Sequence, residues 1–271
     1  MKRGAIGVFD SGFGGLAVLR EFVKKLPQYD YICFGDTARA PYGGHSAEVV
    51  YNFTHSAVEF LFRQGCPLII LACGTASSVA LRKIQREYLP KHYPERRVLG
   101  VVIPSVQSAA ESTKNGRVGI IGTEATISSG AFESELKKIN PRIKVFQKAC
   151  PLLAPMVEAG ETENALSKMA LGKYLRPFAA KHIDTLILGC THYGLLEKEI
   201  KGIVGPGVKI ISEGKSAAEK LKYYLAKHPE IERQLARNGK VKFLTTDITE
   251  KFKKLGSRFF GQPIKPQKVV L

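Results

Sequence analysis

The chain of 271 residues is 44% hydrophobic and 24% charged, a composition typical of a folded globular protein and not of a disordered one. Its longest apolar runs are far shorter than the roughly 20 residues of a membrane helix, and Asp10 interrupts the first apolar stretch too early for a signal peptide. We therefore expect a cytoplasmic protein with no membrane partner. Basic residues produce a formal net charge of +17 but are spread along helix-like stretches such as 221–227 and 251–258, which favours a solvated surface over nucleic-acid binding.

Short β-branched and apolar runs alternate with amphipathic stretches of helical spacing, for example 47–63 and 129–138. The predicted strands are Ala5–Phe9, Tyr31–Phe34, Leu68–Ala72, Val98–Ile103, Val118–Ile121, Lys144–Phe146, Thr185–Leu188 and Val208–Ile211. This alternation predicts an α/β fold with buried parallel sheets. The length favours two lobes, and candidate boundaries lie near Val98 and Ser212.

The first predicted strand leads directly into residues 10–15, Asp-Ser-Gly-Phe-Gly-Gly, which predict a tight turn into a helix. The glycine spacing differs from the G-x-G-x-x-G of dinucleotide sites, no Lys-Ser or Lys-Thr follows, and Asp10 would repel phosphate. Asp10 instead suits an ammonium group or a neighbouring thiol, and Ser11 suits polar substrate atoms. Taken alone, the segment is better explained by an Asp that satisfies its own turn.

The second predicted strand is followed by residues 35–43, whose Pro-Tyr-Gly end has no periodicity. We expect a loop here. Backbone N–H groups in such a loop suit a carboxylate, although a solvated connection explains the segment almost as well.

Five cysteines lie at positions 33, 66, 73, 150 and 190, with no Cys-x-x-Cys pair and no His-x-x-x-His partner. This spacing predicts neither a zinc site nor a disulfide framework, and with no phosphate loop we expect no metal and no cofactor. Free thiols are then either buried apolar groups or reactive groups, and their positions decide between the two.

Cys73 and Cys190 each end a buried strand, and a threonine, Thr75 or Thr191, follows each within two residues. In open α/β sheets, ligands bind beyond the carboxyl ends of the strands. A helix that begins just after each strand would direct N–H groups at the thiol, so we expect both thiol pKa values to be lowered from about 8.5.

Three kinds of thiol chemistry are compatible with these residues. A hydrolase would pair Cys190 with His192 but would leave Cys73 without a role. A redox pair needs close sulfurs, for which this spacing gives no local reason. Inversion of a stereocentre needs a base on one face of Cα and an acid on the other, and two equivalent thiols from facing lobes meet that need.

Four segments resemble the cofactor-independent aspartate/glutamate racemases, and glutamate racemase in particular. They are residues 7–16 (Gly-Val-Phe-Asp-Ser-Gly-Phe-Gly-Gly-Leu), 35–43 (Gly-Asp-Thr-Ala-Arg-Ala-Pro-Tyr-Gly), 72–81 (Ala-Cys-Gly-Thr-Ala-Ser-Ser-Val-Ala-Leu) and 188–193 (Leu-Gly-Cys-Thr-His-Tyr). The resemblance continues through residues 122–126, 150–158 and 244–247, so it covers nearly the whole chain.

The resemblance implies two similar three-layer α/β lobes with the active site between them. Lobe one would be residues 1–97 plus 212–271, with Asp10 and Cys73, and lobe two residues 98–211, with Cys190. It also implies a cytoplasmic homodimer that interconverts L- and D-glutamate without pyridoxal phosphate. Such an enzyme supplies D-glutamate for peptidoglycan, and hence for cell-wall biogenesis and cell shape.

By motif position, the resemblance makes Cys73 and Cys190 the catalytic thiols and gives supporting roles to Asp10, His192 and Glu158. It implies backbone contacts from Tyr42 and Gly43 to the distal carboxylate. The full set of implied substrate contacts is Asp10, Ser11, Tyr42, Gly43, Thr75, Thr123, Thr191 and His192.

The chain departs from the family motif Ala-Cys-Asn-Thr, because Gly74 replaces the asparagine. We expect a slower enzyme, and we expect Gly74→Asn to raise kcat/KM for glutamate if the backbone admits it. Aspartate is the nearest alternative substrate. A weakly active paralogue that acts as a binding protein is the alternative from another class, and only Gly74 and the basic charge favour it.

Overall fold

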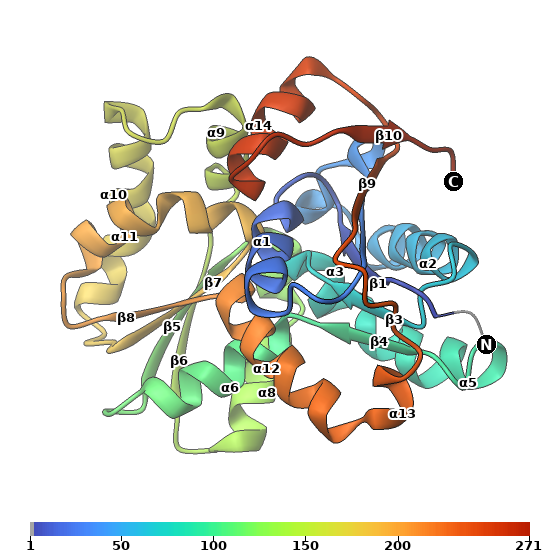
Figure 1. Ribbon diagram of the computed structural model, residues 1–271. Helices are drawn as coiled ribbons and strands as arrows, with labels where there is room; N and C mark the ends of the chain where they lie inside the picture. Colours follow the sequence, from blue (N-terminus) through green and yellow to red (C-terminus); the bar gives the residue numbers. More distant parts are fainter. Residues whose placement is uncertain (1–2) are drawn as a thin grey trace.

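The computed structural model describes residues 3–271, which form two parallel β-sheets covered by helices (Figure 1). The larger sheet has the order β10-β9-β2-β1-β3-β4. Its strands are β1 (Ile6–Asp10), β2 (Tyr31–Gly35), β3 (Leu68–Leu71), β4 (Arg97–Gly100), β9 (Val241–Thr245) and β10 (Pro266–Lys268). The smaller sheet has the order β6-β5-β7-β8, from β5 (Arg117–Gly122), β6 (Lys144–Ala149), β7 (Thr185–Gly189) and β8 (Lys209–Ser212).

Helices connect these strands and cover the faces of both sheets. The α-helices are α1 (Gly15–Lys25), α2 (Ala47–Arg63), α3 (Gly74–Val79), α4 (Leu81–Lys83), α5 (Leu89–His92), α6 (Val102–Ser112), α7 (Glu124–Ser128), α8 (Ala131–Ile139), α9 (Leu153–Ala159), α10 (Ala165–Ala179), α11 (Glu197–Val204), α12 (Glu213–Lys227), α13 (Pro229–Glu232) and α14 (Glu250–Phe260). Short 3-10 helices are η1 (Thr37–Arg39), η2 (Tyr42–Gly44) and η4 (Thr191–Leu196), and η3 (Ile84–Tyr88) is a π-helical turn.

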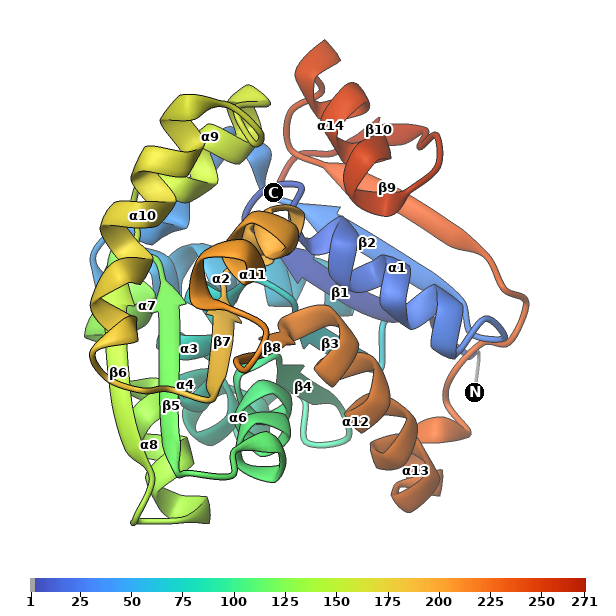
Figure 2. The same ribbon diagram turned by 90° about the vertical axis from the view of Figure 1, so that its left-hand side faces the viewer.

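The strands β1, β3 and β7 are continuous apolar runs because each is buried along its whole length. Helix α1 lies over β1 and β2 (Figure 2) and packs against α12. One apolar cluster contains Val8 and Ile70 of the larger sheet together with Leu186 and Leu188 of the smaller one. The two sheets are therefore joined by a shared core.

The predicted α/β fold with parallel sheets is confirmed, and the main differences lie at three places. The strand predicted at Val98–Ile103 ends at Gly100, because Val102 already begins α6. The segment expected to be a loop contains η1 and η2. Strands β9 and β10 were not predicted, and they extend one edge of the larger sheet. The boundaries of the lobes stay a prediction.

Within residues 3–271, no helix has both the length and the apolar character needed to cross a membrane.

Candidate active site

The candidate residues of the larger sheet follow strands whose ends are aligned. Asp10 ends β1 and pairs in register with Gly35 at the end of β2, and Phe9 pairs with Leu71 at the end of β3. Because the strands are parallel, Asp10, the loop after Gly35 and Cys73 all lie at one edge of this sheet. In the smaller sheet Gly122 pairs with Gly189, so Thr123 and Cys190 emerge together in the same way.

Cys73 is the N-cap residue of α3, and its Sγ lies 3.5 Å from the Ala76 backbone N–H and 3.4 Å from the Ser11 hydroxyl. The residue is only 6% exposed. Burial raises the pKa of the Cys73 thiol to about 12, and the charge of Asp10 adds to the rise, while Ser11 and the Ala76 N–H act in the opposite direction. The expected lowering of the Cys73 pKa is therefore wrong, because desolvation outweighs the hydrogen bonds from Ser11 and the Ala76 N–H.

Cys190 has a different neighbour, the imidazole of His192, whose Nδ1 lies 3.7 Å from the Cys190 Sγ. The other ring nitrogen, Nε2, lies 3.1 Å from Oε1 of Glu158. A carboxylate only accepts hydrogen bonds, so the Nε2–H of His192 donates to Glu158. This chain of contacts orients the ring and brings Glu158, from α9, to the site.

The pKa of Cys190 is raised well above the ordinary thiol value, first by burial and then by the negative charges of Glu213, Cys73 and Asp10, against the His192 backbone N–H. The expected lowering of the Cys190 pKa is therefore wrong as well. The charges of Cys73 and Asp10 act on Cys190 because the two strand ends approach each other. The helix that follows Cys190 is the 3-10 helix η4 and not an α-helix.

Asp10 connects the two sheets at this point. Its Oδ2 accepts a hydrogen bond from the Gly12 N–H at 3.0 Å, as expected for a carboxylate that stabilises its own turn. Its Oδ1 accepts from the Thr191 hydroxyl at 3.5 Å. Burial raises the Asp10 pKa, and His192 is the main influence in the opposite direction. Asp10 thus touches both its own turn and the residue that follows Cys190.

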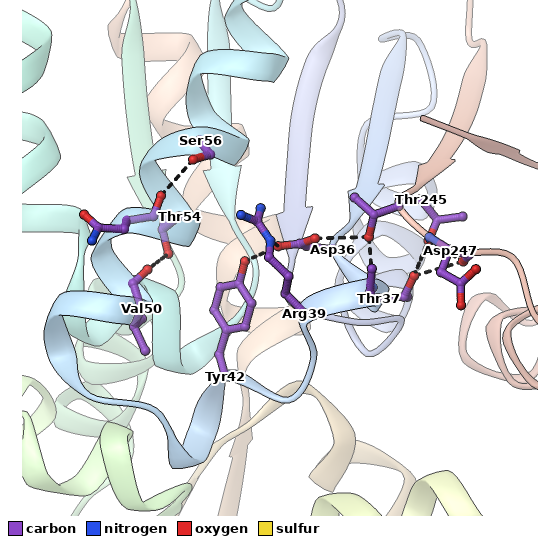
Figure 3. A network of polar contacts seen from close by, with 12 residues as sticks. Asp36, Thr37, Arg39, Tyr42, Val50, Thr54, Ser56, Thr245 and Asp247 are labelled. Carbon is purple, nitrogen blue, oxygen red and sulfur yellow. Dashed lines mark hydrogen bonds and ion pairs between the residues drawn. The ribbon is translucent and has the colours of Figure 1, made fainter. Parts of the chain in front are cut away.

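A polar network holds the loop that carries Tyr42 and Gly43 (Figure 3). The Tyr42 hydroxyl donates to Oδ2 of the buried Asp36 at 2.5 Å, and Arg39 Nε donates to the same oxygen at 2.6 Å. The Thr37 hydroxyl contacts Thr245 at the end of β9. Asp36 was not singled out in the sequence, although it directly follows a buried strand.

The same loop meets the threonines of the other sheet. A Cβ at Gly43 would lie 2.7 Å from the Cβ of Thr123, so the loop approaches this closely only because residue 43 is glycine. The Thr123 hydroxyl lies 2.9 Å from that of Thr75, which is also 3.2 Å from the Thr126 hydroxyl. The structure therefore brings Gly43, Thr75 and Thr123 together and adds Thr126, which the sequence did not single out.

Gly74 lies against the other sheet, so the condition set for Gly74→Asn, a backbone that admits the side chain, is not met. A Cβ at this position would lie 2.5 Å from the Gly189 carbonyl oxygen and 2.7 Å from Oε1 of Glu213. An asparagine has no room without movement of the backbone. The space beside Gly74 is occupied by the buried Glu213, a residue that no sequence motif singled out although it directly follows β8.

Among residues 3–271, no group of three or more His, Cys, Asp or Glu side chains has the arrangement of a metal site.

Residues 6–221 match the Asp/Glu/Hydantoin racemase family. A glutamate racemase of Geobacter metallireducens is 40% identical over 258 residues, which cover 95% of this chain and 93% of the relative. The crystal structure of glutamate racemase isoform RacE1 from Bacillus anthracis matches with a TM-score of 0.91 and 37% sequence identity. The match covers 100% of this chain and 99% of the RacE1 chain. The structure of the Francisella tularensis glutamate racemase in complex with D-glutamate has a TM-score of 0.89 at 33% identity, with coverage of 100% and 98%. The chain therefore belongs to the Asp/Glu/Hydantoin racemase family.

Proposed function

We propose that this protein is a glutamate racemase in which Cys73 and Cys190 transfer protons on opposite faces of the substrate Cα. The observation that supports this most directly is the pair of buried thiols at aligned strand ends of two different sheets, close enough for the charge of one to act on the other. One thiolate removes the Cα proton and the other thiol delivers a proton to the opposite face, and the roles exchange for the reverse reaction.

The two thiols are assisted by different groups in this proposal. Ser11 and Asp10 serve Cys73, and His192 serves Cys190 while Glu158 fixes its ring. Because burial raises both thiol pKa values, one thiol must lose its proton as the substrate enters. The substrate ammonium group favours this loss, since a positive charge close to a thiol stabilises the thiolate.

The carboxylates of glutamate would be held by hydroxyl and backbone N–H donors. Thr75, Thr123 and Thr191 supply hydroxyl groups, and the backbone N–H groups of Tyr42 and Gly43 suit the distal carboxylate. We expect glutamate to be preferred over aspartate, since relatives 33% to 40% identical to this chain are named glutamate racemases.

The remaining parts of the proposal follow from the family. The enzyme would work as a cytoplasmic homodimer, without metal or pyridoxal phosphate, and its D-glutamate would enter peptidoglycan synthesis.

The test is α-proton exchange in deuterium oxide, with EDTA present and no added cofactor. The protein is incubated with L-glutamate, and loss of the Cα proton is followed by NMR while inversion is followed by circular dichroism. We expect loss of the Cα proton and inversion to occur together, whether the reaction starts from L-glutamate or from D-glutamate. We expect aspartate to react more slowly. A protein that binds glutamate but gives neither exchange nor inversion would contradict the proposal.

A further inference from the structure

The last helix of the chain, α14, places an aromatic side chain against His192. Phe259 is fully buried, and the centroid of its ring lies 5.4 Å from that of His192 at an interplanar angle of 76°. Phe13, from the turn that follows β1, lies 5.8 Å from the His192 ring and 5.7 Å from the Phe259 ring, centroid to centroid. The three rings therefore form one cluster, although they come from distant parts of the chain.

The polar contacts of His192 anchor its ring at one end. Nε2 lies 3.1 Å from Oε1 of Glu158, and Nδ1 lies 3.7 Å from the Cys190 sulfur. A ring that is anchored at Nε2 can still swing at its other end. The side chains packed around the ring therefore decide how closely Nδ1 approaches the sulfur.

The contact between Phe259 and His192 has the geometry that aromatic pairs favour. In an edge-to-face pair, the positive edge of one ring meets the negative face of the other. The pair is directional, so a change in the tilt of either ring weakens it. Phe259 thus restricts the swing of the His192 ring.

Two hydrogen bonds hold the end of α14 that carries Phe259. Arg20 of α1 donates from Nη1 to the Phe259 carbonyl oxygen at 3.3 Å. Arg258 donates from Nη2 to the hydroxyl of the buried Thr162 at 3.3 Å. Thr162 lies shortly after α9, the helix that carries Glu158. Phe259 is therefore held relative to α1 and relative to the segment that anchors the imidazole.

The next residue along α14, Phe260, faces a different part of the molecule. It is buried as well, and its ring forms a similar edge contact with Phe243 of β9, at 5.2 Å and 75°. Phe260 therefore packs against the larger sheet, while Phe259 packs against the active site. The two residues are a matched pair that differs in the ring each one meets.

We propose that Phe259 is a positioning residue that holds the His192 imidazole beside the Cys190 sulfur. This inference rests on the proposed function, in which His192 assists Cys190. An imidazole beside a thiol favours the thiolate, whether the ring accepts the thiol proton or already carries a proton of its own. By fixing the ring, Phe259 sets how readily Cys190 becomes a thiolate.

The test measures the rate at which iodoacetamide alkylates Cys190, by mass spectrometry, with Cys73 as the internal reference. Phe259→Leu removes the ring but keeps an apolar side chain, and Phe260→Leu is the matched control. Both substitutions are made in the wild-type chain and in a His192→Gln chain. The second background shows whether Phe259 acts through His192.

We expect Phe259→Leu to slow the alkylation of Cys190 about two- to tenfold, the equivalent of one lost aromatic pair. In the His192→Gln background Phe259→Leu should have no further effect, because the ring that Phe259 positions is gone. Phe260→Leu should leave the Cys190 rate of each parent protein unchanged, and Cys73 should react at the same rate with or without either substitution in α14.

An unchanged Cys190 rate in Phe259→Leu, or an equal change in Phe260→Leu, would overturn the inference. The same change in both backgrounds would overturn it too, since a Phe259→Leu protein that merely admits more reagent reacts faster with or without His192. If Phe259→Leu does not fold, Phe259→Met carries the same expectation.

The alkylation needs no substrate, so its result is independent of whether the protein racemises glutamate. Where racemisation has been measured, Phe259→Leu should lower kcat and leave KM nearly unchanged, because Phe259 acts on a thiol through His192 and not on the bound substrate. Phe260→Leu should change neither quantity. A higher KM at an unchanged kcat in Phe259→Leu would contradict the inference.

Discussion

Cys73 and Cys190 lie in similar positions but have different neighbours. Ser11 and a helix N–H face the first sulfur, and an imidazole held by Glu158 faces the second. Burial raises both pKa values, so both thiols are protonated before the substrate binds. In the proposed mechanism either thiol must become a thiolate, depending on which enantiomer arrives, and a separate set of polar groups at each thiol fits this requirement.

We predict that Cys73→Ser and Cys190→Ser each lower the rate of inversion at least about a thousandfold, because a serine hydroxyl is too weakly acidic to exchange a proton in this way. The rate is measured by circular dichroism from each enantiomer. Cys150→Ser is the control, since Cys150 is a buried cysteine whose sulfur lies 3.5 Å from the Lys148 carbonyl oxygen and to which the proposal gives no role. Racemisation that persists in either single variant would refute the two-thiol mechanism.

The ends of two elements from different sheets meet at the active site. The first residue of α3 lies against the last residue of β7, and η2 lies against the segment that leads from β5 into α7. Glycine at positions 74 and 43 permits both approaches. The geometry of the site therefore depends on backbone contacts between elements as much as on the side chains.

Gly74→Ala should destabilise the protein by about 1 to 3 kcal/mol, because the new Cβ meets a backbone carbonyl that cannot move freely. Urea denaturation gives the free energy of unfolding. Gly202→Ala is the matched control, since Gly202 lies within α11 with open space around its Cβ position, and there alanine should stabilise by about 0.5 to 1 kcal/mol. Equal effects at the two positions would show that the contact with Gly189 is not tight.

Tyr42→Phe removes the hydrogen bond to Asp36 that holds η2 in place. Both residues are fully buried, so we expect a loss of about 1.5 to 3 kcal/mol in the free energy of unfolding. We also expect a higher KM for glutamate, because the loop that carries Gly43 loosens. Tyr223→Phe, at an exposed position, should change neither quantity. A Tyr42→Phe protein with wild-type stability would show that Arg39 and Thr246 hold Asp36 without help from Tyr42.

At the scale of the whole molecule, one apolar cluster joins the two sheets and contains Cys33, Cys150 and Cys190, and a second apolar cluster contains Cys66 and Cys73. Burial raises the pKa values of Cys66, Cys73 and Cys150 to about 12 each. The residues that bury each thiol come from distant parts of the chain, so the effect belongs to the folded protein and disappears when it unfolds.

We predict that the protein loses stability as the pH rises from about 8.5 toward 12. In this window the thiols of the unfolded chain are ionised while those of the folded protein stay protonated. Each such thiol therefore lowers the free energy of unfolding by about 1.4 kcal/mol per pH unit. The melting temperature measured at several pH values tests this. Cys66→Ala removes one of these groups and should make the decline shallower, and an unchanged slope in that variant would contradict the prediction.

The sequence by itself determined the fold class, and it placed the main candidate residues at the ends of strands. Strands such as β1, β3 and β7 are fully buried, so their sequences are continuous apolar runs that can be recognised locally. Parallel strands share one carboxyl edge, so the residues at the ends of these strands, Asp10 and Cys73 among them, could be predicted to lie together at a candidate site without a structure. Strand β9 escaped recognition because it lies near the sheet edge, where the exposed Lys242 breaks the apolar run.

Only the tertiary structure decided the electrostatics and the packing around these residues. The pKa values of the thiols rise rather than fall because desolvation depends on segments that meet only in the folded protein. The same holds for the contact of Gly74 with Gly189 and Glu213, three residues that lie on different elements. A local sequence pattern indicates which helix or strand a residue belongs to. Its burial and its close contacts depend on residues from other parts of the chain.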